Sequence, residues 1–189
     1  MNKLSFNILP NPESNDSEVR ILIDEIDFLG FDYLGIDPPT FFDQNNFDKN
    51  GELMIGRCTC GCEGCADYPI TVKVDENLII WTSENELKLT FEKEDYLNVI
   101  NLGRVDFSWE DLNRKVERLT KNILKNSITE KGYKFDWASA RIKLNTITLS
   151  YSKNGQQKLF EITWDGKSED EIETKVKLFL NNEIKKNSH

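Results

Sequence analysis

Apolar and polar residues alternate along much of the first half of this sequence, and this alternation constrains the fold more than any other feature. A period of two is typical of strands with one buried face. The short connections between the alternating segments predict an antiparallel meander. The expected strands lie near residues 4–8, 19–23, 52–56, 70–74, 78–81 and 87–91, with a loop at 10–17.

Helical patterns follow these strands. Apolar residues spaced by three and four predict an amphipathic helix over 109–126. A capping box, Ser168-Glu-Asp-Glu171, predicts the start of another over 169–185, and Lys185-Lys186 would favour its end. The predicted fold class is therefore α+β, a mainly antiparallel sheet of meander and hairpins with two amphipathic helices packed on one face. Because no repeat or linker divides the chain, residues 1–189 are expected to form a single domain.

Two turns are expected in the last third of the chain. Ile142 and Ile147 have opposite parity in what looks like one strand, which predicts a bulge or bend near Asn145-Thr146. Asn154-Gly155 predicts a type I′ hairpin, since both of its central positions need positive φ. The returning strand is expected near 160–164.

Residues 27–50 carry large apolar side chains without a steady period. Pro38-Pro39 forbids a continuous helix there. We therefore expect an irregular, well-packed segment.

Four cysteines fall within eight residues, between two predicted strands, in the order Gly-Arg-Cys58-Thr-Cys60-Gly-Cys62-Glu-Gly-Cys65. The sequence carries no recognisable signal peptide, and in a reducing compartment crowded cysteines indicate thiols or metal ligands more than disulfides. Structural zinc sites prefer four soft donors in a tetrahedron. The first hypothesis is therefore a structural zinc ion bound by Cys58, Cys60, Cys62 and Cys65.

Three further interpretations of this loop stay open. Three cysteines could bind the ion with Asp67, Glu63 or water as the fourth ligand. Cys62-Glu-Gly-Cys65 could be a redox dithiol, although thioredoxin-type chemistry needs that motif at the start of a helix, and a strand is predicted after Pro69. The cysteines could also simply pack, in a tight turn for which Gly61 and Gly64 supply left-handed conformations.

The cysteine turn, together with the upstream segment Asp32-Tyr-Leu-Gly-Ile-Asp-Pro-Pro39, resembles a group of uncharacterised bacterial proteins with a Gly-Arg-Cys-x-Cys-Gly-x-x-Gly-Cys turn between strands. The resemblance covers about residues 20–95, and Cys62 is an addition of this sequence. It implies a bacterial, intracellular protein with a special turn. It implies no activity.

Charge and motif content exclude several classes of function. Lys and Arg number 24 against 33 Asp and Glu, a net charge of −9 that repels phosphate backbones, so no nucleic-acid partner is expected. No apolar run is long enough to span a membrane, so no membrane partner and a cytoplasmic location are expected. The only histidine is His189 at the terminus and phosphate-binding glycine loops are missing, so no catalytic residue is assigned. The acidic residues within 24–37 are interpreted as solvated loop residues.

The leading functional expectation is a non-enzymatic cytosolic binding or interaction protein. An acidic surface suits a basic protein partner, and an immunity-like protein that neutralises a basic toxin is one such case. The alternative is a metal- or thiol-dependent enzyme, or a redox sensor, centred on the four cysteines.

Overall fold

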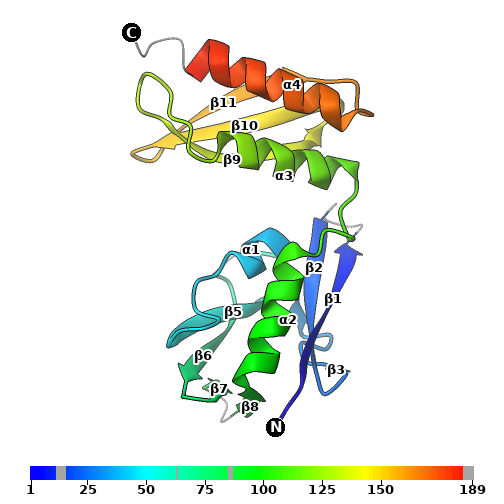
Figure 1. The fold of residues 1–189 in the computed structure, drawn as a ribbon, viewed down its shortest axis with the longest axis vertical. Helices are drawn as coiled ribbons and strands as arrows, with labels where there is room; N and C mark the ends of the chain where they lie inside the picture. The colour runs from blue at the N-terminus through cyan, green and yellow to red at the C-terminus, as the bar shows by residue number, and fades with distance from the viewer. Residues whose placement is uncertain (12–15, 63, 85–86, 185–189) are drawn as a thin grey trace. The chain divides into compact units, whose positions relative to one another are not determined.

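The computed structural model describes residues 1–11, 16–62, 64–84 and 87–184, and over these the chain is α+β (Figure 1). The described residues form four α-helices and eleven strands in three sheets. They divide into two compact units, Met1–Trp109 and Glu110–His189, and each has its own hydrophobic cluster. Sequence patterns predict only two of the four helices, and they do not reveal that the core is divided.

The first unit contains two antiparallel sheets, with strand orders β1-β2-β3 and β4-β5-β6-β7-β8. Each predicted strand lies within an observed one, except that Leu87 precedes β8. The alternation of buried residues therefore identified these strands correctly. All the strands of this unit, including the unpredicted short strands β3 and β4, have the following bounds: β1 (Leu4–Asn11), β2 (Asp16–Ile23), β3 (Ile26–Asp27), β4 (Tyr33–Leu34), β5 (Gly51–Cys58), β6 (Tyr68–Val74), β7 (Leu78–Thr82) and β8 (Lys88–Glu92).

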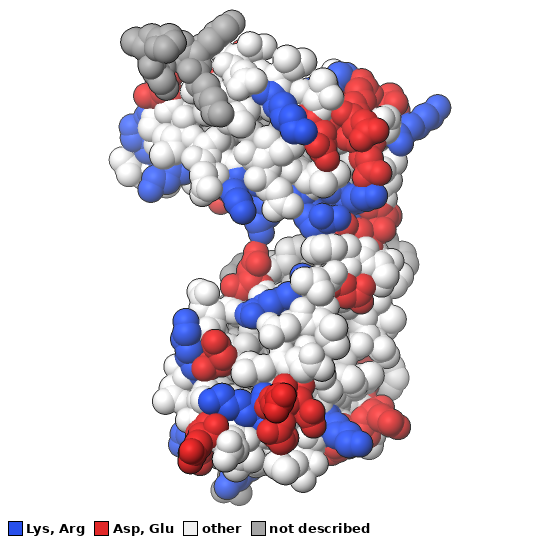
Figure 2. Space-filling view, in the orientation of Figure 1, with Lys and Arg blue, Asp and Glu red and all other residues white. Residues whose placement is uncertain are grey.

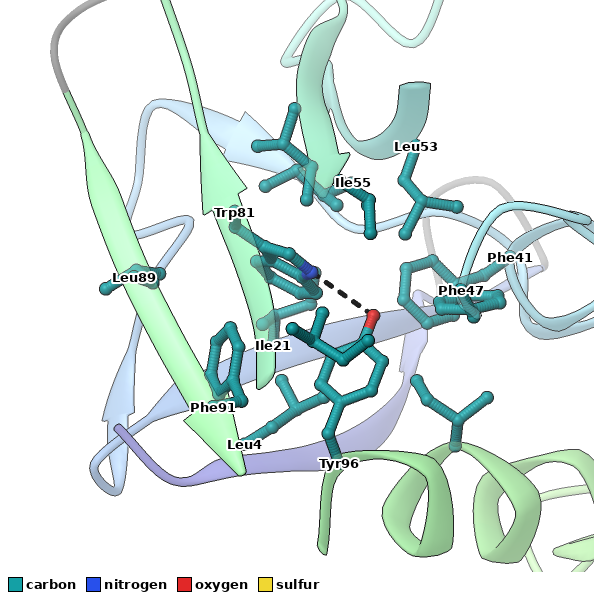
Figure 3. Packing of buried hydrophobic residues seen from close by; sticks show 14 of the residues in the cluster. Leu4, Ile21, Phe41, Phe47, Leu53, Ile55, Trp81, Leu89, Phe91 and Tyr96 are labelled. Carbon is teal, nitrogen blue, oxygen red and sulfur yellow. Dashed lines mark hydrogen bonds between the residues drawn. The ribbon is translucent and has the colours of Figure 1, made fainter. Parts of the chain in front are cut away.

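Backbone hydrogen bonds join the two sheets at both edges. The Val19 amide donates to the Ile36 carbonyl at 2.9 Å, and the Asn2 amide donates to the Thr90 carbonyl at 2.8 Å. The sheets therefore enclose one core, in which Trp81 donates a hydrogen bond to the Tyr96 hydroxyl at 3.2 Å (Figure 3).

Two helices complete this unit, and neither has the usual sequence signal. Helix α1 (Pro38–Phe42) begins at the proline pair that forbids a longer helix, because proline fits the first helical turn. Helix α2 (Lys93–Val105) is capped by Glu92, an uncommon N-cap residue, whose carboxylate accepts from the Asp95 amide at 2.8 Å.

The segment 27–50 is packed, as expected, apart from Phe31, but it is not irregular throughout, because it contains β4 and α1. Phe41 and Phe47 are buried, whereas Phe31 is fully exposed. The buried Arg20 fixes the start of this segment, donating to the Asp27 carboxylate at 2.7 Å and to the Tyr33 carbonyl at 2.8 Å.

In the second unit, a three-stranded antiparallel sheet follows one helix along the chain and precedes another. Its buried cluster combines residues of both helices with Ile147, Leu149 and Tyr151, which alternate along the central strand and so share one face. The elements are α3 (Leu112–Leu124), β9 (Lys134–Lys143), β10 (Thr146–Lys153), β11 (Gln156–Thr163), α4 (Glu169–Phe179) and a π-helical turn, η1 (Leu180–Ile184).

The two predicted turns of this unit have different outcomes. Asn154 and Gly155 have φ of 49° and 76°, which confirms the hairpin between β10 and β11. The bulge or bend predicted near Asn145-Thr146 is present, because the pairing of β10 with β9 shifts register between Thr146 and Thr148, but it does not lie within one strand. Asn145, at φ 52°, turns the chain between β9 and β10, so Ile142 and Ile147 belong to different antiparallel strands and their parity need not agree.

The caps of α3 and α4 refine the predicted helix ends. Asp111 caps α3 by accepting from the Arg114 amide at 2.8 Å, so the helix starts at Leu112 and not at the predicted residue 109. Ser168 caps α4, as predicted, by accepting from the Glu171 amide at 3.3 Å.

Four expectations fall outside the residues that the structure describes. They concern part of the loop at 10–17, the fourth-ligand candidate Glu63, the basic pair Lys185-Lys186 and the terminal His189.

Among the described residues, no helix combines the length and the apolar character needed to cross a membrane.

Candidate metal centre

The cysteine loop connects β5 to β6. Cys58 is the last residue of β5, and Tyr68 opens β6 opposite Gly56. Within the loop, the amide of Gly61 donates to the Cys58 carbonyl at 2.9 Å. Gly61 and Gly64 have φ of 73° and 76°, so the expectation of left-handed glycine turns is confirmed.

This backbone brings three thiols together. The Sγ atoms of Cys58, Cys60 and Cys65 all lie within 4.8 Å of one another. Cys58 is half-buried at the end of its strand, while Cys60 and Cys65 are exposed. Thiolates are preferred ligands of zinc and other soft ions, so small side-chain rotations would let these three sulfurs share one ion.

Cys62, the fourth predicted ligand, is not part of this group of converging sulfurs. Its backbone amide lies 3.5 Å from the Cys60 Sγ, and its own Sγ lies 3.8 Å from the Cys60 carbonyl oxygen. The Cys62 backbone thus donates to the cluster while its thiol is directed at a carbonyl. Amide hydrogen bonds of this kind tune metal-bound sulfurs.

The pKa values of Cys60, Cys62 and Cys65 are shifted in different directions because hydrogen bonds in the loop stabilise the thiolate of Cys60. Hydrogen bonds from the Cys58 thiol, then the Cys62 amide and the Cys65 thiol, lower the pKa of Cys60 to about 7. The same sharing raises the pKa of Cys65 to about 11, first through Cys60 and then through Cys58. Interaction with Cys60 also raises the pKa of Cys62. At neutral pH the metal-free cluster therefore holds its thiolate at Cys60.

Asp67 ties the end of the loop to its start. One carboxylate oxygen accepts from the Gly64 amide at 2.9 Å, and the other lies 3.7 Å from the Arg57 guanidinium. The side chain is only 11% exposed. Asp67, predicted as an alternative fourth ligand, thus holds the loop closed through one oxygen, whereas its buried Oδ1 has the long ion pair with Arg57 and no hydrogen bond among the described residues.

Strand β4 supports the cysteine loop from the side. Tyr33 pairs with Cys58 and Leu34 pairs with Arg57, and the Tyr33 ring lies 4.9 Å from that of Tyr68. The upstream segment 32–39 and the cysteine turn therefore meet at this strand pair. Reasoning from spacing missed this contact, because nothing local predicts which segment pairs with β5.

Gly56 is needed where these segments meet. A Cβ at this position would lie 2.9 Å from the Leu29 Cδ2 and 3.3 Å from the Tyr33 Cβ. The close approach of the loop before β4 therefore depends on a residue without a side chain.

The acidic residues of 24–37 have structural partners. Asp24 accepts from the Asn2 side chain and the Lys3 amide, each at 2.8 Å, which lowers its pKa. Asp27 binds Arg20. These two carboxylates are therefore occupied in holding the turn after β2.

Fold and site together define a two-unit α+β protein whose first unit presents three converging thiols at a loop between strands, a donor set suited to a thiophilic metal ion. Comparison with protein family models, curated proteins and solved structures gave no match.

Proposed function

We propose that Cys58, Cys60 and Cys65 bind one zinc ion that closes the β5–β6 loop. The observation that carries this proposal is the mutual approach of the three Sγ atoms within 4.8 Å. Two left-handed glycines and the Asp67 anchor give the loop a shape in which the three sulfurs converge. A site prepared in this way loses less conformational entropy on binding.

Metal analysis of untagged protein, purified without chelator, tests this proposal. We expect about one zinc per chain. A chromogenic thiol reagent should find Cys62 reactive in the native protein, and the other three cysteines only after denaturation. A preparation without metal and with four freely titratable thiols would overturn the proposal.

Matched variants distinguish the proposed zinc ligands from the neighbouring Cys62. Cys65→Ser should lose the zinc, because two thiolates and water bind it much more weakly than three. Cys62→Ser should keep the zinc, because its amide donor is retained.

We further propose that the whole chain is a cytosolic binding protein with a basic protein partner. An immunity protein that neutralises a basic toxin would be one example. The net charge of −9 supports it. Figure 2 shows both signs interspersed, with acidic side chains gathered over the start of α4, where Glu169, Asp170 and Glu171 form the first turn. A pull-down from native lysate that recovers no basic protein would count against this role.

The pKa of about 7 at Cys60 favours redox sensing as a second candidate function. Hydrogen peroxide would oxidise the Cys60 thiolate to a sulfenic acid with release of hydroxide, and the thiol of Cys58 or Cys65 would then displace water to give a disulfide. Mass spectrometry after peroxide treatment tests it. A disulfide formed at low peroxide supports the function, and only overoxidised Cys60 contradicts it.

A further inference from the structure

We infer that the zinc ion keeps one coordination position for a neutral nitrogen donor of the imidazole kind, supplied by a partner molecule. This inference rests on the proposed zinc site. It makes the cysteine loop an interaction site, with a histidine side chain of the partner completing the metal shell.

The donor count leads to this conclusion. Zinc in proteins takes four ligands, and a site with three protein ligands keeps a position for water or another molecule. The described part of the loop brings three sulfurs together. The Cys62 thiol is directed at a carbonyl, and Asp67 is engaged by Gly64 and Arg57.

The exposure of the site places the remaining position within reach of a partner. Cys60 and Cys65 are exposed, and the half-buried Cys58 anchors the cluster at the end of β5. Two of the three sulfur donors are therefore accessible from solvent. A structural zinc site that is complete within its own chain has all four coordination positions filled by protein ligands.

Charge selects the kind of donor. Zinc with three thiolates carries one net negative charge, and the chain already carries −9. A fourth thiolate or a carboxylate would add a further negative charge at an exposed site, whereas an imidazole nitrogen adds none. Imidazole is also among the commonest ligands of zinc.

Aromatic side chains beside the loop suit such a contact. Tyr33 and Tyr68 are half-buried and their rings pack at a tilt, 4.9 Å apart, next to the paired Cys58, and the fully exposed Phe31 lies two residues before Tyr33. Aromatic residues of this kind supply much of the binding energy in protein interfaces. Arg20 holds this segment through the Tyr33 carbonyl, so the aromatic side chains extend from a fixed backbone.

Cobalt(II) substitution of the untagged protein tests the inference, because cobalt reports both the number of thiolates and changes in the coordination shell. We expect a sulfur-to-cobalt charge-transfer band that is unchanged in Cys62→Ser and that, in Cys65→Ser saturated with excess cobalt to offset its weaker binding, falls by about a third, as one of three ligands is lost. Titration with imidazole should shift the visible ligand-field bands saturably while the charge-transfer band keeps its intensity.

Each contrary result has a definite meaning. No cobalt binding would overturn the zinc site itself. Cobalt binding with a charge-transfer band that falls by about a quarter in Cys62→Ser would leave the zinc site standing and overturn the open position, since four thiolates would then be ligands. An imidazole response that emerges only in Glu63→Gln or His189→Ala would also overturn it, by showing that the chain fills the position itself.

Discussion

Cys60 is the residue that most strongly determines the thiol chemistry of the loop. Its sulfur accepts hydrogen bonds from the Cys58 thiol, the Cys62 amide and the Cys65 thiol, which is why its pKa falls from 9.0 to about 7. The thiolate is the form that binds metal and reacts with electrophiles. Loop geometry thus sets reactivity, because the pKa of Cys62, two residues away, is shifted in the opposite direction.

The pH dependence of alkylation tests this arrangement. In the metal-free protein, the rate of Cys60 modification by iodoacetamide should be half-maximal near pH 7 and fall below it, as the thiolate is protonated. Cys58→Ala should move the midpoint upward because the largest stabilising donor is lost. Cys58→Ser, which keeps a donor, should move it less. Peptide mass spectrometry measures the rates, and equal midpoints in the three proteins would contradict the hydrogen-bond explanation.

A second prediction at the scale of single residues concerns Gly61. Its φ is 73°, and no atom lies within 4 Å of the point where a Cβ would stand, so an alanine would meet backbone strain and no clash. Gly61→Ala should therefore lower the free energy of unfolding by about 1 kcal/mol, and Gly61→Asn by less, since asparagine tolerates this conformation. Urea denaturation measures both. Equal losses in the two variants would show that the strain is not the cause.

At the scale of elements, α3 and β9 are joined by a buried carboxylate. Glu117 of α3 accepts from the Ala140 amide at 2.7 Å, from the Ser139 hydroxyl at 3.0 Å and from the Arg141 guanidinium at 3.0 Å. Its other oxygen lies 3.4 Å from Arg114. A backbone amide of β9 that would otherwise lack a strand partner is thus satisfied by a helix side chain.

Removing this carboxylate should destabilise the second unit strongly. Glu117→Ala removes the acceptor of a buried backbone amide and one partner of the buried Arg114, and we expect a loss of about 3 kcal/mol. The matched control is Glu161→Ala, which removes an exposed pair with Lys143 and should cost less than about 1 kcal/mol. Chemical denaturation compares them, and similar losses would contradict a structural role for Glu117.

At the scale of the whole molecule, the chain holds two cores. The first is enclosed by two sheets and contains Trp81 and Tyr96, and the second lies between β10 and the helices α3 and α4. The candidate metal centre belongs to the first unit alone. Metal binding stabilises the unit that holds the ion, because the ion binds its folded state.

Chelation should therefore affect one unit. Removal of the ion should increase hydrogen exchange in peptides covering β5 and β6, while peptides covering β9 to β11 keep their protection. Mass spectrometry of exchanged peptides resolves the two. A uniform increase across both units, or none in the first, would contradict a metal-stabilised loop.

The sequence by itself determined the local features of this protein. Alternating apolar residues identified the strands of the first unit, Asn154-Gly155 identified a hairpin, and Ser168 identified the start of α4, because each depends on neighbouring residues alone. The cysteines marked the candidate site for the same reason, since their eight-residue spacing allows them to meet whatever the rest of the chain does.

Only the tertiary structure decided the features that depend on distant residues. It paired β4 with β5 beside Cys58, closed two sheets around one core, and separated the second unit at Glu110. It also grouped Cys58 with Cys60 and Cys65 while directing the Cys62 thiol to a carbonyl. The physical reason is that spacing fixes which side chains can meet, whereas the folded backbone fixes the direction in which each one points.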